Sequence, residues 1–138
     1  MQFEIVTPEK IIFQGDVDEV YVNTVDGEIG ILPHHVNLFS KVEPGELKYK
    51  KSGKSEYLAI TGGFVEVNNN TVTILADYAV PAEAIEVNKA MEARKRAEEL
   101  LKKKETQMNE REFAEAQAAF KQAIAELHVA NRRHRRVH

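Results

Sequence analysis

The stretch Ala79-Val80-Pro81-Ala82 divides this 138-residue chain into two parts of different composition. All seven glycines lie at or before Gly63 and all four prolines at or before Pro81, whereas residues 82–138 contain neither and hold 12 of the 15 alanines. The first part is rich in Val, Ile, Thr, Tyr and Phe, which favour strands, and the second consists mostly of strong helix formers. The composition therefore predicts an α+β chain, with a β domain over residues 1–82 and a helical domain over residues 83–138.

Short runs of strand-forming residues separated by turn residues fill the first part. Asp26-Gly27 is a hairpin signal, and the run at residues 68–70 consists of asparagines, which tolerate left-handed backbone. This many short strands in one small domain fits a β-sandwich or flattened barrel with antiparallel neighbours. The predicted strands are 2–7, 10–14, 17–24, 29–32, 46–50, 55–61, 64–68 and 71–76.

Apolar residues recur at helical spacing in the second part, with a break at residues 102–107. Asn109 followed by Glu112 has the spacing of a helix N-cap with a reciprocal acidic partner. We therefore expect an antiparallel hairpin of two helices, each of roughly 20 residues. Because the first stripe is mostly alanine, which buries little area, this hairpin should be marginally stable alone and able to open or re-dock. The stripes are Ala90, Ala93, Ala97, Leu100 and Leu101, then Phe113, Ala116, Phe120, Ala123, Ile124 and Leu127.

Charge is distributed unevenly between the two parts. Residues 1–82 carry 12 acidic and 6 basic side chains, whereas residues 83–138 carry 10 acidic and 13 basic side chains. An acidic body with a basic end suggests that the two parts face different partners, or that the end lies on an acidic surface. Arginines at a chain end can also neutralise phosphates, but no aromatic residues are interleaved with these, so we do not expect a nucleic-acid partner. The four terminal arginines are Arg132, Arg133, Arg135 and Arg136.

Several kinds of chemistry lack their sequence signals. The chain contains no cysteine, and hence no disulfide, thiolate metal site or cysteine nucleophile. No phosphate-binding glycine loop occurs, and Gly62-Gly63 is interpreted as a bulge or tight strand connection. His34-His35 has no accompanying ligand array, so we expect no metal site, and no catalytic triad can be assembled. With no bilayer-length apolar run and no secretory signal, we expect a soluble, cytoplasmic chain that is not a catalyst by itself.

Residues 26–35 read DGEIGILPHH, residues 60–67 read ITGGFVEV, and residues 72–77 read VTILAD. Together with residues 5–9 and 90–94, these runs resemble, in order and spacing, the motifs of the epsilon subunit of F-type ATP synthases. The match covers essentially the whole chain. One departure is His34, which stands where the family usually has glycine, so the backbone of this turn is expected to differ.

The resemblance implies a non-catalytic subunit of the rotary central stalk, coupling proton flow (in some organisms sodium flow) to ATP synthesis while the catalytic nucleotide sites belong to other subunits. It also implies a β domain that binds the gamma subunit and rests on the ring of c subunits. Membrane association is then only through the complex, as a peripheral protein on the cytoplasmic side of a bacterial plasma membrane. The residues that match the ring-contacting region are Glu28, Ile29, Gly30, Ile31 and Leu32, with His35 beside them.

We expect the helical hairpin to regulate the enzyme. In a compact state it packs against the β domain; in an extended state the second helix runs beside gamma, and its basic side chains meet an acidic segment of the beta subunits, next to the alpha subunits. That arrangement would block rotation in the hydrolysis direction. The candidates for these charge contacts are Lys121, Arg132, Arg133, Arg135 and Arg136. The alternative is a permanently folded hairpin with a solvated tail.

Some bacterial members of this family bind ATP between the two helices through a motif I/L-D-x-x-R-A. Here Ile85 and Ala90 match, but the aspartate position is Glu86 and the arginine position is Lys89, which cannot reproduce a planar bidentate fork. Arg96 is one further candidate. We therefore expect no cofactor, with regulatory ATP as the less favoured interpretation. Two other functions stay open at this stage: a free-standing nucleotide-sensing module, and an adaptor that merely shares this architecture.

Overall fold

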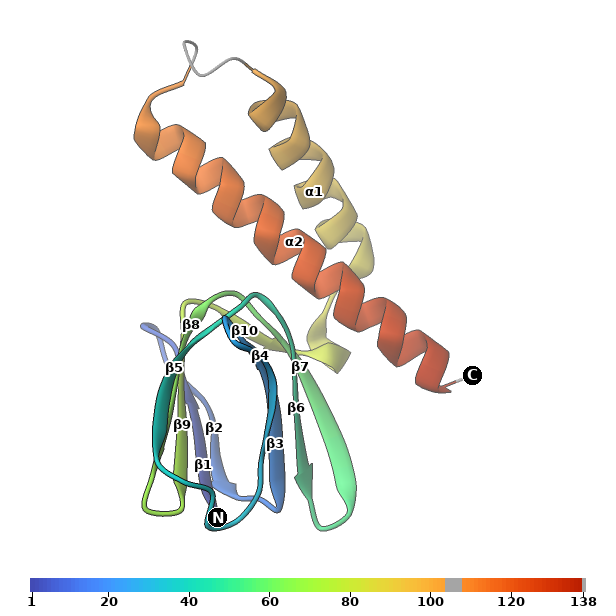
Figure 1. The fold of residues 1–138 in the computed structure, drawn as a ribbon. Helices are drawn as coiled ribbons and strands as arrows, with labels where there is room; N and C mark the ends of the chain where they lie inside the picture. Colours follow the sequence, from blue (N-terminus) through green and yellow to red (C-terminus); the bar gives the residue numbers. More distant parts are fainter. Residues whose placement is uncertain (104–107, 138) are drawn as a thin grey trace.

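The computed structural model describes residues 1–103 and 108–137, with side chains described as far as Arg132. Within these residues a β domain is followed by a short 3₁₀ helix and two α-helices that project from one end of it (Figure 1). The predicted α+β architecture is confirmed. The strands are β1 (Gln2–Val6), β2 (Ile11–Asp16), β3 (Glu19–Thr24), β4 (Gly27–Ile31), β5 (Leu38–Val42), β6 (Gly45–Lys51), β7 (Lys54–Ile60), β8 (Gly63–Asn68), β9 (Thr71–Ala76) and β10 (Ala79–Pro81).

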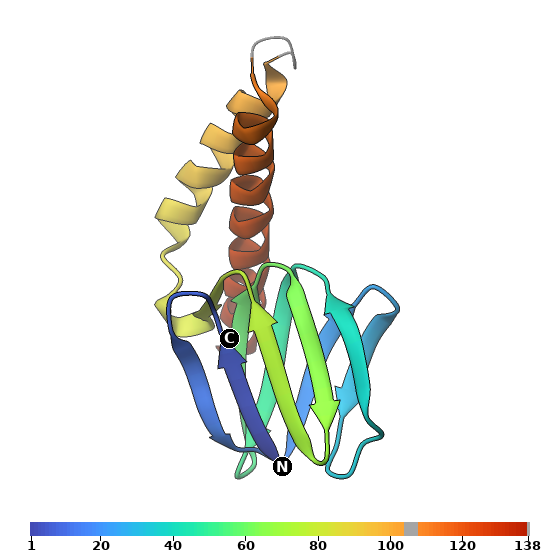
Figure 2. The same cartoon turned by 90° about the vertical axis from the view of Figure 1, so that its left-hand side faces the viewer.

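The strands pair in the order β10-β7-β6-β3-β5-β8-β9-β1-β2, with β4 on the side of β3. β3 and β5 share one backbone pair, Thr24 with Val42, and the sheet folds over at this point into two layers. Figure 2 shows the layer of β2, β1, β9, β8 and β5 face-on. Our expectation of antiparallel neighbours is wrong for β1 and β9, which run parallel. The strand predictions also omitted β5 and β10.

The two layers enclose one apolar core. Phe3, Ile5, Leu47 and Ile74 are at most 1 % exposed, and the Phe13 ring packs on Phe3 with ring centroids 5.8 Å apart. The buried members of this core all lie between residues 3 and 79, so the helices contribute none of them. The β domain therefore has a core of its own, which does not depend on the helical domain.

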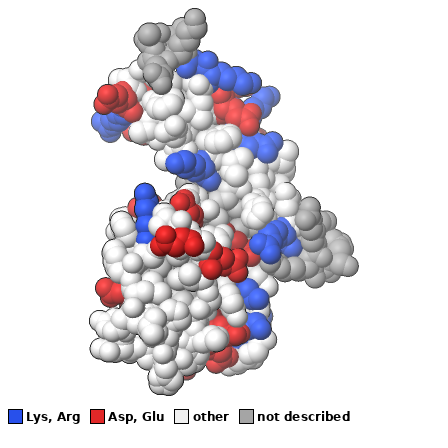
Figure 3. Space-filling model, viewed as in Figure 1, with Lys and Arg blue, Asp and Glu red and all other residues white. Residues whose placement is uncertain are grey.

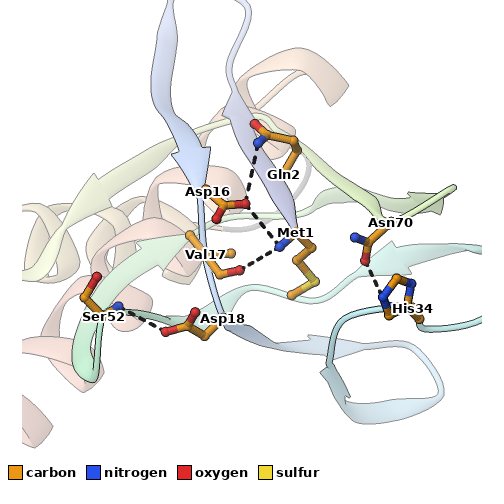
Figure 4. A network of polar contacts seen from close by, with 8 residues as sticks. All are labelled: Met1, Gln2, Asp16, Val17, Asp18, His34, Ser52 and Asn70. Atoms are coloured by element: carbon orange, nitrogen blue, oxygen red, sulfur yellow. Dashed lines mark hydrogen bonds and ion pairs between the residues drawn. The ribbon is translucent and has the colours of Figure 1, made fainter.

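Polar contacts close the end of the sandwich that lies away from the helices (Figure 4). The Met1 ammonium lies 3.2 Å from the Asp16 carboxylate, and the Ser52 backbone N–H donates to Asp18 at 3.0 Å. His34 has a left-handed φ of 66°, the region that glycine favours, and its N–H donates to Asn70 Oδ1 at 2.8 Å. His34 thus adopts a backbone conformation that glycine favours, and the bond to Asn70 helps to hold it there.

The Gly62-Gly63 doublet is a tight strand connection, as predicted. Gly62 and Gly63 have φ values of 45° and 146°, and a Cβ atom on Gly63 would overlap the carbonyl oxygen of Leu75. Glycine is required here because β8 and β9 approach too closely for a side chain.

Two helices form the predicted hairpin, but with unequal lengths. The 3₁₀ helix η1 (Ala82–Ala84) leads into α1 (Val87–Lys102, 16 residues), and α2 (Glu110–Val137) has 28 residues. The predicted cap starts α2: the Glu112 N–H donates to Asn109 Oδ1 at 2.8 Å, and the Asn109 amide donates to the Glu112 carboxylate at 3.0 Å.

The buried face of α2 is divided between two neighbours. Ala116 and Ala123 are buried with Ala90 and Ala97 of α1, as the alanine stripes predict. A second set, Ala125 and Val129, instead packs on Ala59 of β7 and Ala82 of η1. Ile124, which the second stripe includes, is 41 % exposed, because the helix turns neighbouring positions toward α1 and toward the sandwich.

Tyr78, between β9 and β10, adds a polar contact to this docked arrangement. Its hydroxyl is hydrogen-bonded to the Glu126 carboxylate and the Gln122 amide of α2, and Gln122 also donates to Glu126 at 3.0 Å. The pKa of Tyr78 is raised to about 12. The largest cause is partial burial, and the charge of Glu126 and its hydrogen bond are the next largest. The neutral phenol is thus the form that the docked hairpin favours.

We predict that hairpin docking weakens at alkaline pH through this tyrosine. The docked state holds the Tyr78 proton more tightly than the undocked chain does. The contribution of Tyr78 to the stability of docking is therefore fully present below its ordinary pKa of 10.0 and is lost as the pH rises towards about 12. Amide hydrogen exchange in α2, compared with the Tyr78→Phe variant, measures this loss. Tyr21→Phe, on β3, is the matched control; an identical pH response in all three proteins would contradict the prediction.

Candidate functional site

The residues expected to face the c-ring lie along one strand and the loop after it. Glu28 is exposed beside the β3–β4 turn, whereas His35 lies beyond the other end of β4. Ile31 is fully buried in the sandwich core, so it supports this region from inside and cannot contact a partner. Ile29 is half-buried, while Gly30 and Leu32 are exposed, so they can form a contact surface together with Glu28.

A second surface was not predicted from the sequence. Phe39, Phe64 and Leu75, on the neighbouring strands β5, β8 and β9, are 63 %, 42 % and 49 % exposed. The Phe39 and Phe64 rings stack with centroids 5.3 Å apart. Next to them is a depression of about 430 Å³ lined in part by Pro8, Lys41 and Leu75. We call Phe39, Phe64 and Leu75 the aromatic face; it lies on the sheet layer seen in Figure 2. Exposed apolar groups gathered in this way are typical of a protein interface.

The candidate inhibitory residues lie on α2 where it crosses the sandwich. Arg132 Nη1 is 3.2 Å from Glu46 Oε1 of β6, and the Glu46 side chain is only 9 % exposed. Lys121 is exposed and lines the same side of α2 as Arg132. The side chains of Arg133, Arg135 and Arg136 lie outside the described residues. Glu46 was not among the predicted site residues, because nothing in its sequence neighbourhood indicates a partner far along the chain.

The candidate nucleotide residues are only partly brought together. Ile85, Glu86, Lys89 and Ala90 line a pocket of about 290 Å³ between β10, α1 and α2, whereas Arg96 lies in a different pocket beside Leu100. The Lys89 ammonium pairs with Glu86 at 3.1 Å.

Glu126 and Tyr78 complete the lining of this pocket. Two carboxylates, Glu86 and Glu126, thus face a single lysine that already has a carboxylate partner. This charge arrangement is opposite to the one that a polyphosphate requires.

Neither metal binding nor a membrane span has structural support in the described residues. Within this part of the chain, no group of three His, Asp or Glu side chains could hold a metal ion. Of the two helices described, neither is long and apolar enough to cross a bilayer.

Known proteins resemble this chain over its whole length. Residues 1–82 match the family model of the β-sandwich domain of the ATP synthase delta/epsilon chain, and residues 83–131 match that of its long α-helix domain. The ATP synthase epsilon chain of Herpetosiphon aurantiacus is 41 % identical over 99 % of this chain and 98 % of its own length. That of Syntrophobacter fumaroxidans is 42 % identical over 96 % of each.

Solved structures agree with these relatives. A chain in the Euglena gracilis mitochondrial ATP synthase, in a structure of its OSCP, F1 and c-ring, superposes with a TM-score of 0.70 at 26 % identity, over 86 % of this chain and 74 % of that one. A chain of the Tetrahymena thermophila central stalk and c-ring has the same fold, with a TM-score of 0.62 at 16 % identity, over 94 % of this chain and 96 % of that one. The chain therefore belongs to the delta/epsilon family of ATP synthase subunits.

Proposed function

We propose that this chain is the non-catalytic epsilon subunit of a proton-translocating F-type ATP synthase, where it joins the gamma subunit to the c-ring and restrains ATP hydrolysis through its hairpin. The observation that carries the proposal is the separation of two cores: a self-contained sandwich with an exposed aromatic face, and a hairpin docked on one end of it. The sandwich can stay bound in the stalk while the hairpin moves. The bacterial relatives support a location at the cytoplasmic side of a bacterial plasma membrane, held there by the complex.

The two exposed surfaces of the sandwich suit two partners. The aromatic face offers stacked Phe39 and Phe64, which bury apolar area well against the apolar surface of another subunit such as gamma. The polar, glycine-containing region around Glu28 suits the polar loops of the c-ring. We therefore assign gamma to the aromatic face and the c-ring to Glu28, Gly30 and Leu32.

Crosslinking from single cysteines tests both assignments, because the natural chain has none. Phe64→Cys and Glu28→Cys, each carrying a photoactivatable maleimide, should crosslink to gamma and to the c-ring, respectively, in the assembled enzyme. Met91→Cys on α1, 49 % exposed and away from both surfaces, is the control. The assignment would be refuted if Phe64→Cys crosslinked to the c-ring and Glu28→Cys to gamma, or if all three positions crosslinked equally.

The proposed inhibition uses the basic side chains of α2 in two ways. In the docked state Arg132 is held by Glu46 of the sandwich. In the extended state Arg132 and Lys121 would instead face an acidic segment of the beta subunits, beside alpha, and resist rotation in the hydrolysis direction. Docking and inhibition then compete for the same arginine, so contacts with the sandwich set the extent of inhibition.

Truncation tests whether residues 82–138 inhibit at all. A chain ending at Pro81 keeps every buried member of the sandwich core, so it should fold and co-purify with gamma. We expect the catalytic head carrying it to hydrolyse ATP several-fold faster than the head carrying the full chain. Equal rates with both chains bound would leave only the coupling role, and failure of both to bind gamma would contradict the stalk assignment.

Glu46→Gln tests the competition for Arg132. Removing this charge should cost about 1 kcal/mol of docking, which shifts the ratio of extended to docked chains about fivefold and lowers hydrolysis by the head. The same change in a chain ending at Pro81 should have no effect. Glu92→Gln, at an exposed α1 position, is the matched control. If hydrogen exchange shows that the hairpin of Glu46→Gln has undocked while hydrolysis is unchanged, inhibition by extension is wrong.

A further inference from the structure

A groove of about 310 Å³ lies on the side of α2 that faces away from α1. Its walls come from parts of the chain that are far apart in sequence: Phe120 and Ile124 of α2 on one side, and Pro44 and Gly45 at the start of β6 on the other. These residues make the groove largely apolar. Its volume is near the lower limit for small-molecule sites, about 300 Å³.

Three nitrogen-bearing side chains line the groove from the helix side. Lys121, His128 and Arg132 lie seven and four residues apart, which places them along one face of α2. Arg132 is paired with Glu46, whereas the Lys121 ammonium has no ion pair with any described side chain. The groove therefore combines an apolar wall with an accessible positive charge on its helix side.

One carboxylate, Glu46, lines the sandwich side of the groove, and it pairs with Arg132. Figure 3 shows a hollow between the helices and the sandwich, with a basic side chain projecting beside it and both basic and acidic side chains on the sandwich below. The basic side chain left for a ligand is Lys121, because Arg132 already pairs with Glu46, so the groove suits one negative charge rather than several. A ligand that fits this groove has one negative charge, which faces Lys121 of α2. Its apolar body lies along Phe120 and Ile124.

We propose that this groove binds a small amphipathic monoanion, namely a medium-chain fatty carboxylate, with the carboxylate on Lys121 and the apolar body against Ile124 and Pro44. The bound molecule contacts α2 and the sandwich at once. It therefore binds the docked hairpin better than the extended one and stabilises the docked state by mass action. This regulatory consequence rests on the proposed function, but the binding itself does not.

Binding is tested with the full chain and octanoate, followed by amide and side-chain NMR. We expect saturable shifts at Phe120, Ile124 and His128, and much weaker binding of the neutral analogue octanol. Lys121→Gln and Ile124→Glu should each weaken octanoate binding about tenfold, since they remove the charge-assisted bond and the apolar contact, respectively. Lys95→Gln and Met91→Glu, exposed on α1, are the matched controls and should bind octanoate as the unaltered chain does. Both altered groove residues are exposed, so the fold should be retained.

The proposal is overturned if octanoate leaves the groove signals unchanged, if octanol binds as tightly, or if Lys121→Gln binds like the unaltered chain. The regulatory step is read separately, from hydrolysis by the catalytic head. Octanoate should accelerate a head carrying the full chain and leave a head carrying the chain ending at Pro81 unaffected. Binding in the groove with no acceleration would support the site and count against the inhibitory role of the hairpin.

Discussion

The docked hairpin depends on an apolar contact in which Ala125 and Val129 of α2 pack on Ala59 and Ala82. Three larger side chains, Tyr57, Val80 and Ile85, are partly buried against these four residues. Short side chains bring the helix close to the sandwich but remove little apolar area from water, at roughly 25 cal/mol per Å². The sandwich, in contrast, buries large side chains such as Phe3 and Leu47 completely. The sandwich core is therefore built from large side chains, whereas the fully buried side chains of the docking contact are small.

Polar contacts decide where the hairpin docks. Two polar contacts join α2 to the sandwich: Arg132 pairs with Glu46 of β6, and Glu126 bonds to Tyr78, between β9 and β10. Each contact requires α2 to lie in one register along the sandwich. Glu46 is nearly buried, so losing Arg132 would leave a carboxylate with poor solvation. Arg132 itself is half-exposed, which keeps the net gain from the pair modest and sensitive to salt. Specific docking and easy release are thus compatible in the same ion pair.

Local patterns were enough to predict the sandwich, the hairpin and the Asn109 cap of α2, because each depends on residues near one another in sequence. The parallel pairing of β1 with β9 could not be predicted in this way, because it joins segments about 70 residues apart. β5 was missed although it alternates, since its outward positions carry Phe39, and an exposed aromatic does not match the usual polar-out pattern.

The candidate site shows the same limit. Ile31 belongs to the matched ring-contacting motif, yet its side chain is in the core, because alternate residues of a strand face opposite sides. Arg96 is separated from the other candidate nucleotide residues by its position along α1. Glu46 and Tyr78 gain their importance only from the path of α2 across the sandwich, which no local pattern determines.

The internal bonds of α2 explain how such a hairpin can extend without unfolding. Arg111 with Glu115, and Gln122 with Glu126, are pairs four residues apart that stay with the helix wherever it goes. Extension breaks only the interactions that α2 makes with other elements. At the start of α1, Glu86 is in an extended conformation and makes no side-chain capping bond, so the connection after η1 anchors the helix only weakly. In the proposed switch α2 therefore moves as an intact rod, and the free energy that has to be overcome is that of docking, not of helix formation.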